Sequence, residues 1–189
     1  MRVISGSMKG RLLSFPKDIR PTQNKIRKAV FDIVGQDMSG IDFLELFAGS
    51  GAVSLEALSR NAARVSMVER DSASIETIES NLNTLNIDGY GESGAQVRIF
   101  PTDVFISIKK FSEKQEKFDV IFADPPYEVG LGKKTLKTIV AYDILQPNTV
   151  VIIQHHKNEI LPEDEGRIRL IRRRQYGSSV LSIYQQPVE

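Results

Sequence analysis

The chain has 189 residues, of which 26% are charged and 41% hydrophobic, a composition typical of one soluble globular domain. It contains no cysteine, which excludes a disulfide scaffold, a thiol nucleophile and any zinc or iron–sulfur site built on thiolates. No apolar run reaches the roughly 18 residues that a membrane helix needs, and no signal-peptide pattern opens the chain. We therefore expect a cytoplasmic protein without membrane contact.

Positive charge gathers at the two ends of the chain. Residues 1–30 carry eight Lys or Arg and one acid, residues 31–165 carry twelve and twenty-two, and residues 166–189 carry five and one. The overall charge of +1 therefore hides two basic ends around an acidic middle. If the ends meet in the fold, they form a basic surface that suits a polyanion such as nucleic acid. The alternative is that these are ordinary solvated faces.

The first part of the chain predicts a β-hairpin followed by a helix. Val3–Ile4 and Leu12–Phe15 are short apolar runs with glycines between them. Pro21 disfavours helix before it, and Thr22 is a suitable N-cap. Apolar residues then recur at helical spacing as far as Val34, so we expect this helix to follow the hairpin directly.

From residue 42 onward, apolar strand patterns alternate with helical patterns. The predicted strands cover residues 42–47, 65–68, 96–100, 118–123 and 149–154. This alternation is typical of a parallel sheet with helices on both faces. Two further strand patterns, over 167–172 and 180–184, follow with no helix between them. They predict an antiparallel hairpin at the edge of the sheet.

Polar or glycine-rich segments follow four of the predicted strands. Because the carboxyl ends of parallel strands share one rim, where ligands bind in such folds, we expect these segments to converge. The segments are Gly49-Ser50-Gly51, Glu69, Asp103 and Asp124-Pro125-Pro126-Tyr127.

The first two segments predict a nucleoside cofactor. Gly49 and Gly51 permit a sharp turn and a close approach to a ligand, and Glu69 stands where a carboxylate accepts hydrogen bonds from a ribose diol. Ser54 occupies the place where a dinucleotide site prefers a third glycine, which disfavours NAD and a reductase. Glu45 suits a cationic ligand such as S-adenosylmethionine. A pair of ordinary loop glycines and a solvated or paired Glu45 are the alternatives.

The segment Asp124-Pro125-Pro126-Tyr127 points to chemistry at an exocyclic amine. The prolines fix the backbone and leave carbonyls without the usual neighbouring N–H donors. A carboxylate, a fixed carbonyl and an aromatic ring then lie within four residues. The ring can stack on a nucleobase, a contact of about 1–3 kcal/mol, and the acceptors can stabilise positive charge growing on nitrogen. The alternative is a turn with a packed tyrosine.

These motifs resemble the RsmD family, S-adenosylmethionine-dependent methyltransferases that modify guanine N2 in bacterial 16S rRNA. The resemblance covers nearly the whole chain. Family members often carry Asp, Gly and Phe where Glu45, Ser54 and Tyr127 stand, and none of these departures touches the expected chemistry. The matching segments are Arg2–Gly6 with Gly10-Arg11, Arg20–Thr22 with Arg27 and Phe31, Glu45–Gly51, Val68–Asp71, Asp124–Tyr127 and Arg174–Gly177.

The resemblance implies a class I, Rossmann-like methyltransferase fold. Its α/β sheet is seven-stranded and mostly parallel, in the order 3-2-1-4-5-7-6 with strand 7 antiparallel, and an N-terminal β-hairpin and helix precede it. It implies a basic, RNA-binding extension over 1–34 and a catalytic domain that binds S-adenosylmethionine over 35–189. We expect a monomer without a metal, acting on 16S rRNA or the small ribosomal subunit.

The resemblance also implies three groups of site residues. The target guanine is expected on Asp124, Pro125, Pro126 and Tyr127. The cofactor is expected on Glu45, Phe47, Gly49, Ser50, Gly51, Glu69, Arg70 and Asp103. Contacts with the RNA are expected from Arg2, Lys9, Arg11, Arg20, Thr22, Lys25, Arg27, Lys28 and Arg174, although any single charge can instead be a solvated side chain.

Other functions remain compatible with the motifs. A DNA adenine-N6 methyltransferase uses the same segment but usually needs a further recognition domain, for which 189 residues leave little room. A protein-glutamine N5 methyltransferase typically has Asn where Asp124 stands. A non-catalytic assembly factor that binds S-adenosylmethionine or RNA would keep the same pattern.

Overall fold

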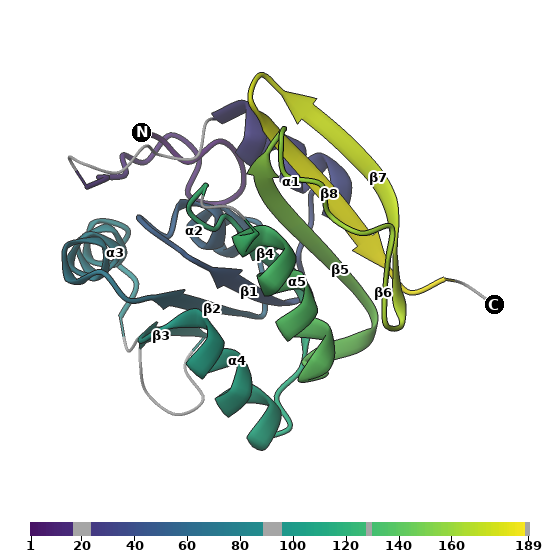
Figure 1. Cartoon of the computed structure of the whole chain (residues 1–189). Coiled ribbons are helices and arrows are strands. Elements are labelled where there is room, and N and C mark those ends of the chain that lie inside the picture. Colours follow the sequence, from purple (N-terminus) through teal and green to yellow (C-terminus); the bar gives the residue numbers. More distant parts are fainter. Residues whose placement is uncertain (17–23, 89–95, 128–129, 188–189) are drawn as a thin grey trace.

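The computed structural model describes residues 1–16, 24–88, 96–127 and 130–187 (Figure 1). In this part of the chain, five helices surround one sheet of eight strands. The strands are β1 Asp42–Leu46, β2 Arg64–Glu69, β3 Val97–Pro101, β4 Phe118–Ala123, β5 Leu145–His156, β6 Asp164–Glu165, β7 Ile168–Tyr176 and β8 Ser179–Gln185. The helices are α1 Asn24–Val34, α2 Ala52–Ser59, α3 Ser72–Thr84, α4 Val104–Glu113 and α5 Leu131–Ala141.

The sheet has the order β3-β2-β1-β4-β5-β8-β7-β6. Strands β1 to β5 are parallel, and β8 lies antiparallel between β5 and β7. The predicted parallel core and antiparallel edge hairpin are therefore confirmed. The expected number of seven strands is wrong by one, because the two-residue strand β6 pairs with the start of β7. Two residues are too short to give a strand pattern.

Helices cover both faces of the sheet, and the central strands are apolar on both sides as a result. Along β1, Phe43 packs into the core formed with α1, α2 and α3, whereas Leu44 packs into the core formed with α4 and α5. Figure 1 shows α4 and α5 in front of the sheet and α2 behind it. This layering leaves the carboxyl ends of the parallel strands to the connecting loops, which form the site.

The N-terminal segment turns back on itself as predicted, but it pairs less extensively than a regular hairpin. It is held by an isolated bridge between Arg2 and Leu12 and by a 3.0 Å hydrogen bond from the Val3 N–H to the Arg11 carbonyl. Val3 is buried in the same core as Leu55 of α2. The boundary proposed at residue 34 stays a prediction. None of the described helices has the length and apolar character needed to cross a bilayer.

Candidate active site

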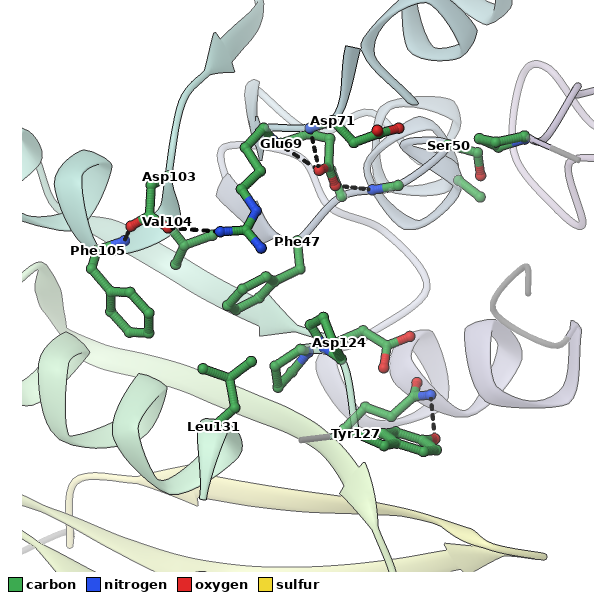
Figure 2. A pocket seen from close by; sticks show the side chains of 18 of the residues that line it. Phe47, Ser50, Glu69, Asp71, Asp103, Val104, Phe105, Asp124, Tyr127 and Leu131 are labelled. Atoms are coloured by element: carbon green, nitrogen blue, oxygen red, sulfur yellow. Dashed lines mark hydrogen bonds and ion pairs between the residues drawn. The ribbon is translucent and has the colours of Figure 1, made fainter. Parts of the chain in front are cut away.

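A cavity of about 980 Å³ opens at the carboxyl ends of the parallel strands. All four segments singled out in the sequence line it. They contribute Phe47–Ser50 after β1, Glu69–Asp71 after β2, Thr102–Phe105 after β3 and Asp124–Tyr127 after β4. Figure 2 shows Glu69 and Asp103 on one side of this cavity, Asp124 and Tyr127 on the other, and Phe47 between them. The volume lies within the range of small-molecule and cofactor sites in proteins.

The two glycines of the first loop serve different purposes. Both have a left-handed backbone, with φ of 54° at Gly49 and 69° at Gly51. A Cβ on Gly51 would lie 2.8 Å from Met67 Sδ and 3.3 Å from a carbon of Ile78, so this glycine allows α2, β2 and α3 to pack closely. A Cβ on Gly49 would meet no atom within 4 Å. Gly49 lines the cavity and Gly51 does not.

Glu69 fixes the shape of the loop beside it. Its Oε2 accepts a 2.8 Å hydrogen bond from the Gly49 N–H, and its Oε1 accepts from the N–H groups of Arg70 at 2.8 Å and Asp71 at 2.9 Å. An ionised carboxylate offers about four acceptor sites. Three are used, which leaves one on Oε2 for a hydroxyl donor in the cavity.

The end of β3 adds a second acid and an aromatic wall. Asp103 caps α4 by accepting a 2.8 Å hydrogen bond from the Phe105 N–H, and its other oxygen lies 3.7 Å from the Arg70 guanidinium. The ring of Phe105 meets that of Phe47 edge to face, with centroids 6.5 Å apart. The side chain of Arg70 is 74% exposed, so this ion pair lies at the rim of the cavity.

Glu45 lies behind the first loop and not in the lining of the cavity. It is buried, and its Oε2 accepts a 2.8 Å hydrogen bond from the Ser54 N–H of α2. Burial, with a smaller contribution from the charge of Asp124, raises the pKa of the Glu45 carboxyl to about 7. Glu45 therefore supports the loop through α2. Its expected contact with the cofactor stays a prediction.

The segment after β4 continues directly into the cavity. The N–H of Asp124 donates to the Leu46 carbonyl at 3.4 Å, which holds this segment beside the end of β1. The hydroxyl of Tyr127 lies 2.7 Å from Ser179 Oγ, and Gln154 Nε2 donates to the same hydroxyl at 3.3 Å. Tyr127 remains 47% exposed. Its ring is therefore anchored at the hydroxyl and partly exposed.

Several lining residues were not predicted from the sequence. Phe15, Lys134, Gln154 and Ser179 all line the cavity. Gln154 had a signal, since it is a polar residue that ends an apolar strand. Ser179 had none, because it reaches the rim only through the antiparallel pairing of β8 with the end of β5.

Phe15 is brought to the cavity by a buried side chain of α3. Asn81 accepts a 2.7 Å hydrogen bond from the Ser14 N–H, and its amide donates at 3.1 Å to the carbonyls of both Ser14 and Ser50. The N-terminal segment is therefore fastened to the glycine loop. Such a long-range link is invisible to local sequence patterns.

Arg27 does not fit the predicted set of RNA contacts. Its side chain is fully buried, where it donates to the Arg2 carbonyl at 2.8 Å and to Asn24 Oδ1 at 2.7 Å and lies 3.8 Å from Glu56. Burial lowers the pKa of the Arg27 guanidinium, with Glu56 opposing that effect. Glu56 also accepts from the N–H groups of Ile4 and Ser5. Arg27 thus joins the N-terminal segment to α2, and a phosphate cannot reach it in this structure.

The remaining basic residues of that set have different positions. Arg2, Lys9, Arg11, Lys25 and Lys28 are exposed, and Arg174 on β7 is half-buried. Arg11 donates to the Thr84 carbonyl and Arg2 to the Gly10 carbonyl, so these two also shape the N-terminal turn. Arg20 and Thr22 lie outside the described residues. The contacts expected of this set with RNA stay predictions.

No cluster of three or more His, Cys, Asp or Glu able to hold a metal ion occurs among residues 1–16, 24–88, 96–127 and 130–187. The polar groups that line the cavity are carboxylates, backbone groups, an amide, hydroxyls, a lysine and, at the rim, the Arg70 guanidinium. This set suits an uncharged or cationic organic ligand better than a phosphate chain, since three acidic side chains line the wall formed after β2 and β3.

The structure has the fold of S-adenosylmethionine-dependent methyltransferases. It shows five parallel strands, an antiparallel strand between β5 and β7, a glycine loop after β1 and an acid at the end of β2. An RNA methyltransferase from Salinibacter ruber, solved in complex with S-adenosyl-L-homocysteine, shares this fold. Its TM-score is 0.65 at 17% identity, over 90% of this chain and 95% of that chain. The cofactor of this fold class is S-adenosylmethionine.

The chain belongs to the family described as Conserved hypothetical protein 95, whose model matches residues 1–185. The resemblance to the RsmD family is thereby confirmed. The Ribosomal RNA small subunit methyltransferase D of Buchnera aphidicola (strain APS) is 34% identical over 86% of this chain and 82% of that protein. The solved structure of yhhF from Escherichia coli has a TM-score of 0.83 and 27% identity, over 100% of this chain and 99% of that chain.

Proposed function

We propose that this protein transfers a methyl group from S-adenosylmethionine to the N2 amine of a guanine in 16S rRNA. The observation that carries the proposal is that the glycine loop, Glu69 and the segment Asp124–Tyr127 line one cavity. An rRNA substrate is supported by the name of the Buchnera relative. The choice of guanine N2 comes from the resemblance to the RsmD family.

The residues on the side of β1, β2 and β3 fit the cofactor. Gly49 leaves open space where a side chain would stand, so a ligand can approach its backbone. The free acceptor site of Glu69 suits a ribose hydroxyl, and Asp103, which lines the same cavity, can accept a hydrogen bond from the adenine amine. When bound, S-adenosylmethionine supplies the methyl group, whose S–C bond breaks as the N–C bond forms, and the amine proton then passes to water.

The residues after β4 fit the target base. The Asp124 carboxylate and the Pro125 carbonyl can accept the hydrogens of the amine, and the partly exposed ring of Tyr127 can stack on the purine. These acceptors also stabilise the positive charge that grows on nitrogen. Catalysis under this proposal consists of positioning and electrostatic stabilisation, and the guanine must leave its stack to reach the cavity.

The proposal is tested by following labelled methyl groups from S-adenosylmethionine. Substrates are small ribosomal subunits from a strain lacking the gene, naked 16S rRNA and duplex DNA, and the products are resolved as nucleosides. We expect label in N2-methylguanosine, its loss in Asp124→Ala, and unchanged labelling by the matched surface variant Asp88→Ala.

Cofactor binding must be measured on the same preparations, so that a folding defect is not read as lost chemistry. Asp124→Ala is expected to keep its affinity for S-adenosylmethionine. Label in N6-methyladenine of DNA, in protein glutamine, or in no acceptor while the cofactor still binds would contradict the proposal.

A further inference from the structure

Helix α5 carries three lysines, although it lies within residues 31–165, the part of the chain with a net negative charge. Lys133, Lys134 and Lys137 lie on this helix, and none of its eleven residues is acidic. No ion pair involves these three ammonium groups among the described residues. Their positive charge is therefore not cancelled on the helix itself.

The lysines line an open hollow of about 380 Å³ on the surface, which we call the α5 groove. One acid comes near it, since Glu159 accepts a 3.0 Å hydrogen bond from the backbone N–H of Lys133. Tyr142, which is 38% exposed, adds an aromatic ring just past the end of the helix. The lining residues are Gly130, Lys133, Lys134, Lys137, Thr138, Ala141 and Tyr142.

The α5 groove adjoins the candidate active site through one shared residue. Lys134 lines both hollows, and its ammonium lies 4.0 Å from the centroid of the Phe105 ring in the wall of the cavity. A chain whose base enters the cavity can therefore continue along α5. The helix is about 15 Å long, so more than one phosphate of the strand can lie along it.

We propose that the α5 groove binds the backbone of the RNA strand that flanks the target base. The proposal rests on the proposed function and extends it, because it gives the RNA a contact surface within the catalytic domain beyond the two basic ends of the chain. Lysines on a helix beside the cavity supply the charge that attracts phosphates, and the exposed ring of Tyr142 offers a stacking face. A polyanion matches this surface better than an acidic protein patch because the groove adjoins, at Lys134, the cavity proposed to receive the base.

The test compares two double variants that each remove two positive charges. Lys133→Gln with Lys137→Gln changes the α5 groove and spares Lys134, which also lines the active site. Lys110→Gln with Lys114→Gln is the matched control, because these exposed lysines lie at the other end of α4, away from the rim. The probes are in vitro transcribed 16S rRNA and small subunits from a strain lacking the gene, titrated over a series of salt concentrations.

We expect the α5 variant to raise the Kd for both probes roughly 5- to 20-fold near 0.1 M salt and to flatten the salt dependence of log Kd by about one to two ions. The affinity of the α5 variant for S-adenosylmethionine and its melting temperature should not change. A second double variant, Lys133→Arg with Lys137→Arg, keeps both positive charges and should bind RNA like the original chain. The control should stay within about twofold of the original chain.

Three results would overturn this inference. The first is an equal loss of RNA affinity in the Lys110 and Lys114 control. The second is an α5 variant whose Kd and salt slope equal those of the original chain. The third is a loss of affinity for assembled subunits but not for naked rRNA, which would assign the groove to a ribosomal protein. If the original chain methylates 16S rRNA while the α5 variant binds it normally, only the inference on α5 fails. If the original chain neither binds nor methylates rRNA, the proposed function fails with it.

Discussion

The backbone N–H of Gly49 donates to the Glu69 carboxylate at 2.8 Å, so the loop after β1 is tied to the end of β2. The same carboxylate accepts from the N–H groups of Arg70 and Asp71. Glu69 therefore fixes the shape of this end of the cavity as well as lining it. Its remaining acceptor site is held in place by these three donors.

Replacing this carboxylate should weaken both the loop and the cofactor site. In Glu69→Gln the new NH₂ group faces backbone N–H donors, so we expect a loss of about 1–3 kcal/mol in the free energy of unfolding. The affinity for S-adenosylmethionine should fall at least about tenfold as a ribose acceptor is lost. Calorimetric titration and denaturant unfolding measure the two effects. Glu76→Gln, on the exposed side of α3, should change neither, and unchanged cofactor affinity in Glu69→Gln would count against the assigned role.

The two glycines of the loop should separate folding from binding. Gly51→Ala places a methyl group against Met67 and Ile78, and we expect this crowding to cost about 1–3 kcal/mol of stability, in addition to about 1–2 kcal/mol for its left-handed backbone. Gly49→Ala meets only the backbone strain of a left-handed residue, about 1–2 kcal/mol, but its methyl group enters the cavity. Gly49→Ala should therefore lose more cofactor affinity than Gly51→Ala. The reverse order in a binding titration would show that the cofactor does not lie against Gly49.

The buried Glu45 should make stability depend on pH. Its pKa is raised from 4.5 to about 7 by burial, so the folded chain holds this proton more tightly than the unfolded chain. The free energy of unfolding should therefore fall by about 3 kcal/mol in total as the pH rises from 4.5 to about 7. Above about pH 7, Glu45 should add little further change. Glu45→Gln keeps an acceptor for Ser54 and removes the titration. Denaturant unfolding at pH 5 and pH 8 should show a smaller difference in this variant, and an equal difference would contradict the assignment.

Arg27 should behave as a structural residue. Arg27→Met leaves the buried Glu56 without one of its charge partners, and we expect a loss of about 3–5 kcal/mol of stability, moderated by Arg60, which still contacts Glu56. The exposed neighbour Lys28→Gln should cost less than about 0.5 kcal/mol. Thermal unfolding measures both variants. A stable Arg27→Met protein with weakened RNA binding would reinstate Arg27 as an RNA contact.

Tyr127 should act through its ring more than through its hydroxyl. Tyr127→Phe removes the contacts with Ser179 and Gln154 but keeps the stacking face, whereas Tyr127→Ala removes both. We expect Tyr127→Ala to lower kcat/KM for rRNA by about 5- to 150-fold, in line with about 1–3 kcal/mol for stacking on a base, and Tyr127→Phe to have a smaller effect. Cofactor affinity should be unchanged in both. Equal losses in the two variants would assign the role to the hydroxyl.

Most of the sheet could be predicted because its strands are local apolar runs separated by helical patterns. The polar ends of these runs also located Glu69, Asp103 and Asp124 correctly, since parallel strands must end at one rim. What the sequence could not show depends on contacts between distant segments. The burial of Arg27 follows from the pairing of α1 with α2, which no local pattern reveals.

Two residues at the rim of the cavity, Phe15 and Lys134, could not be predicted for the same reason. Phe15 reaches the cavity because Asn81, 67 residues from Ser14 in sequence, holds the N-terminal segment there. Lys134 was hidden by the negative net charge of residues 31–165, because a charge sum over a long segment says nothing about which face of a helix collects the lysines. Charges therefore have to be counted by surface, which requires the fold.

The proposed function requires Asp124 to hold a guanine amine for methylation in 16S rRNA. This requirement can be tested in cells that lack the gene and are complemented with the original chain, Asp124→Ala or Asp88→Ala, by position-resolved mass spectrometry of the small-subunit rRNA. We expect an N2-methylguanosine that is missing from the deletion strain to return with the original chain and with Asp88→Ala, and to stay missing with Asp124→Ala. A modification that returns fully with Asp124→Ala, or small-subunit rRNA with identical N2-methylguanosine in the deletion and parent strains, would contradict it.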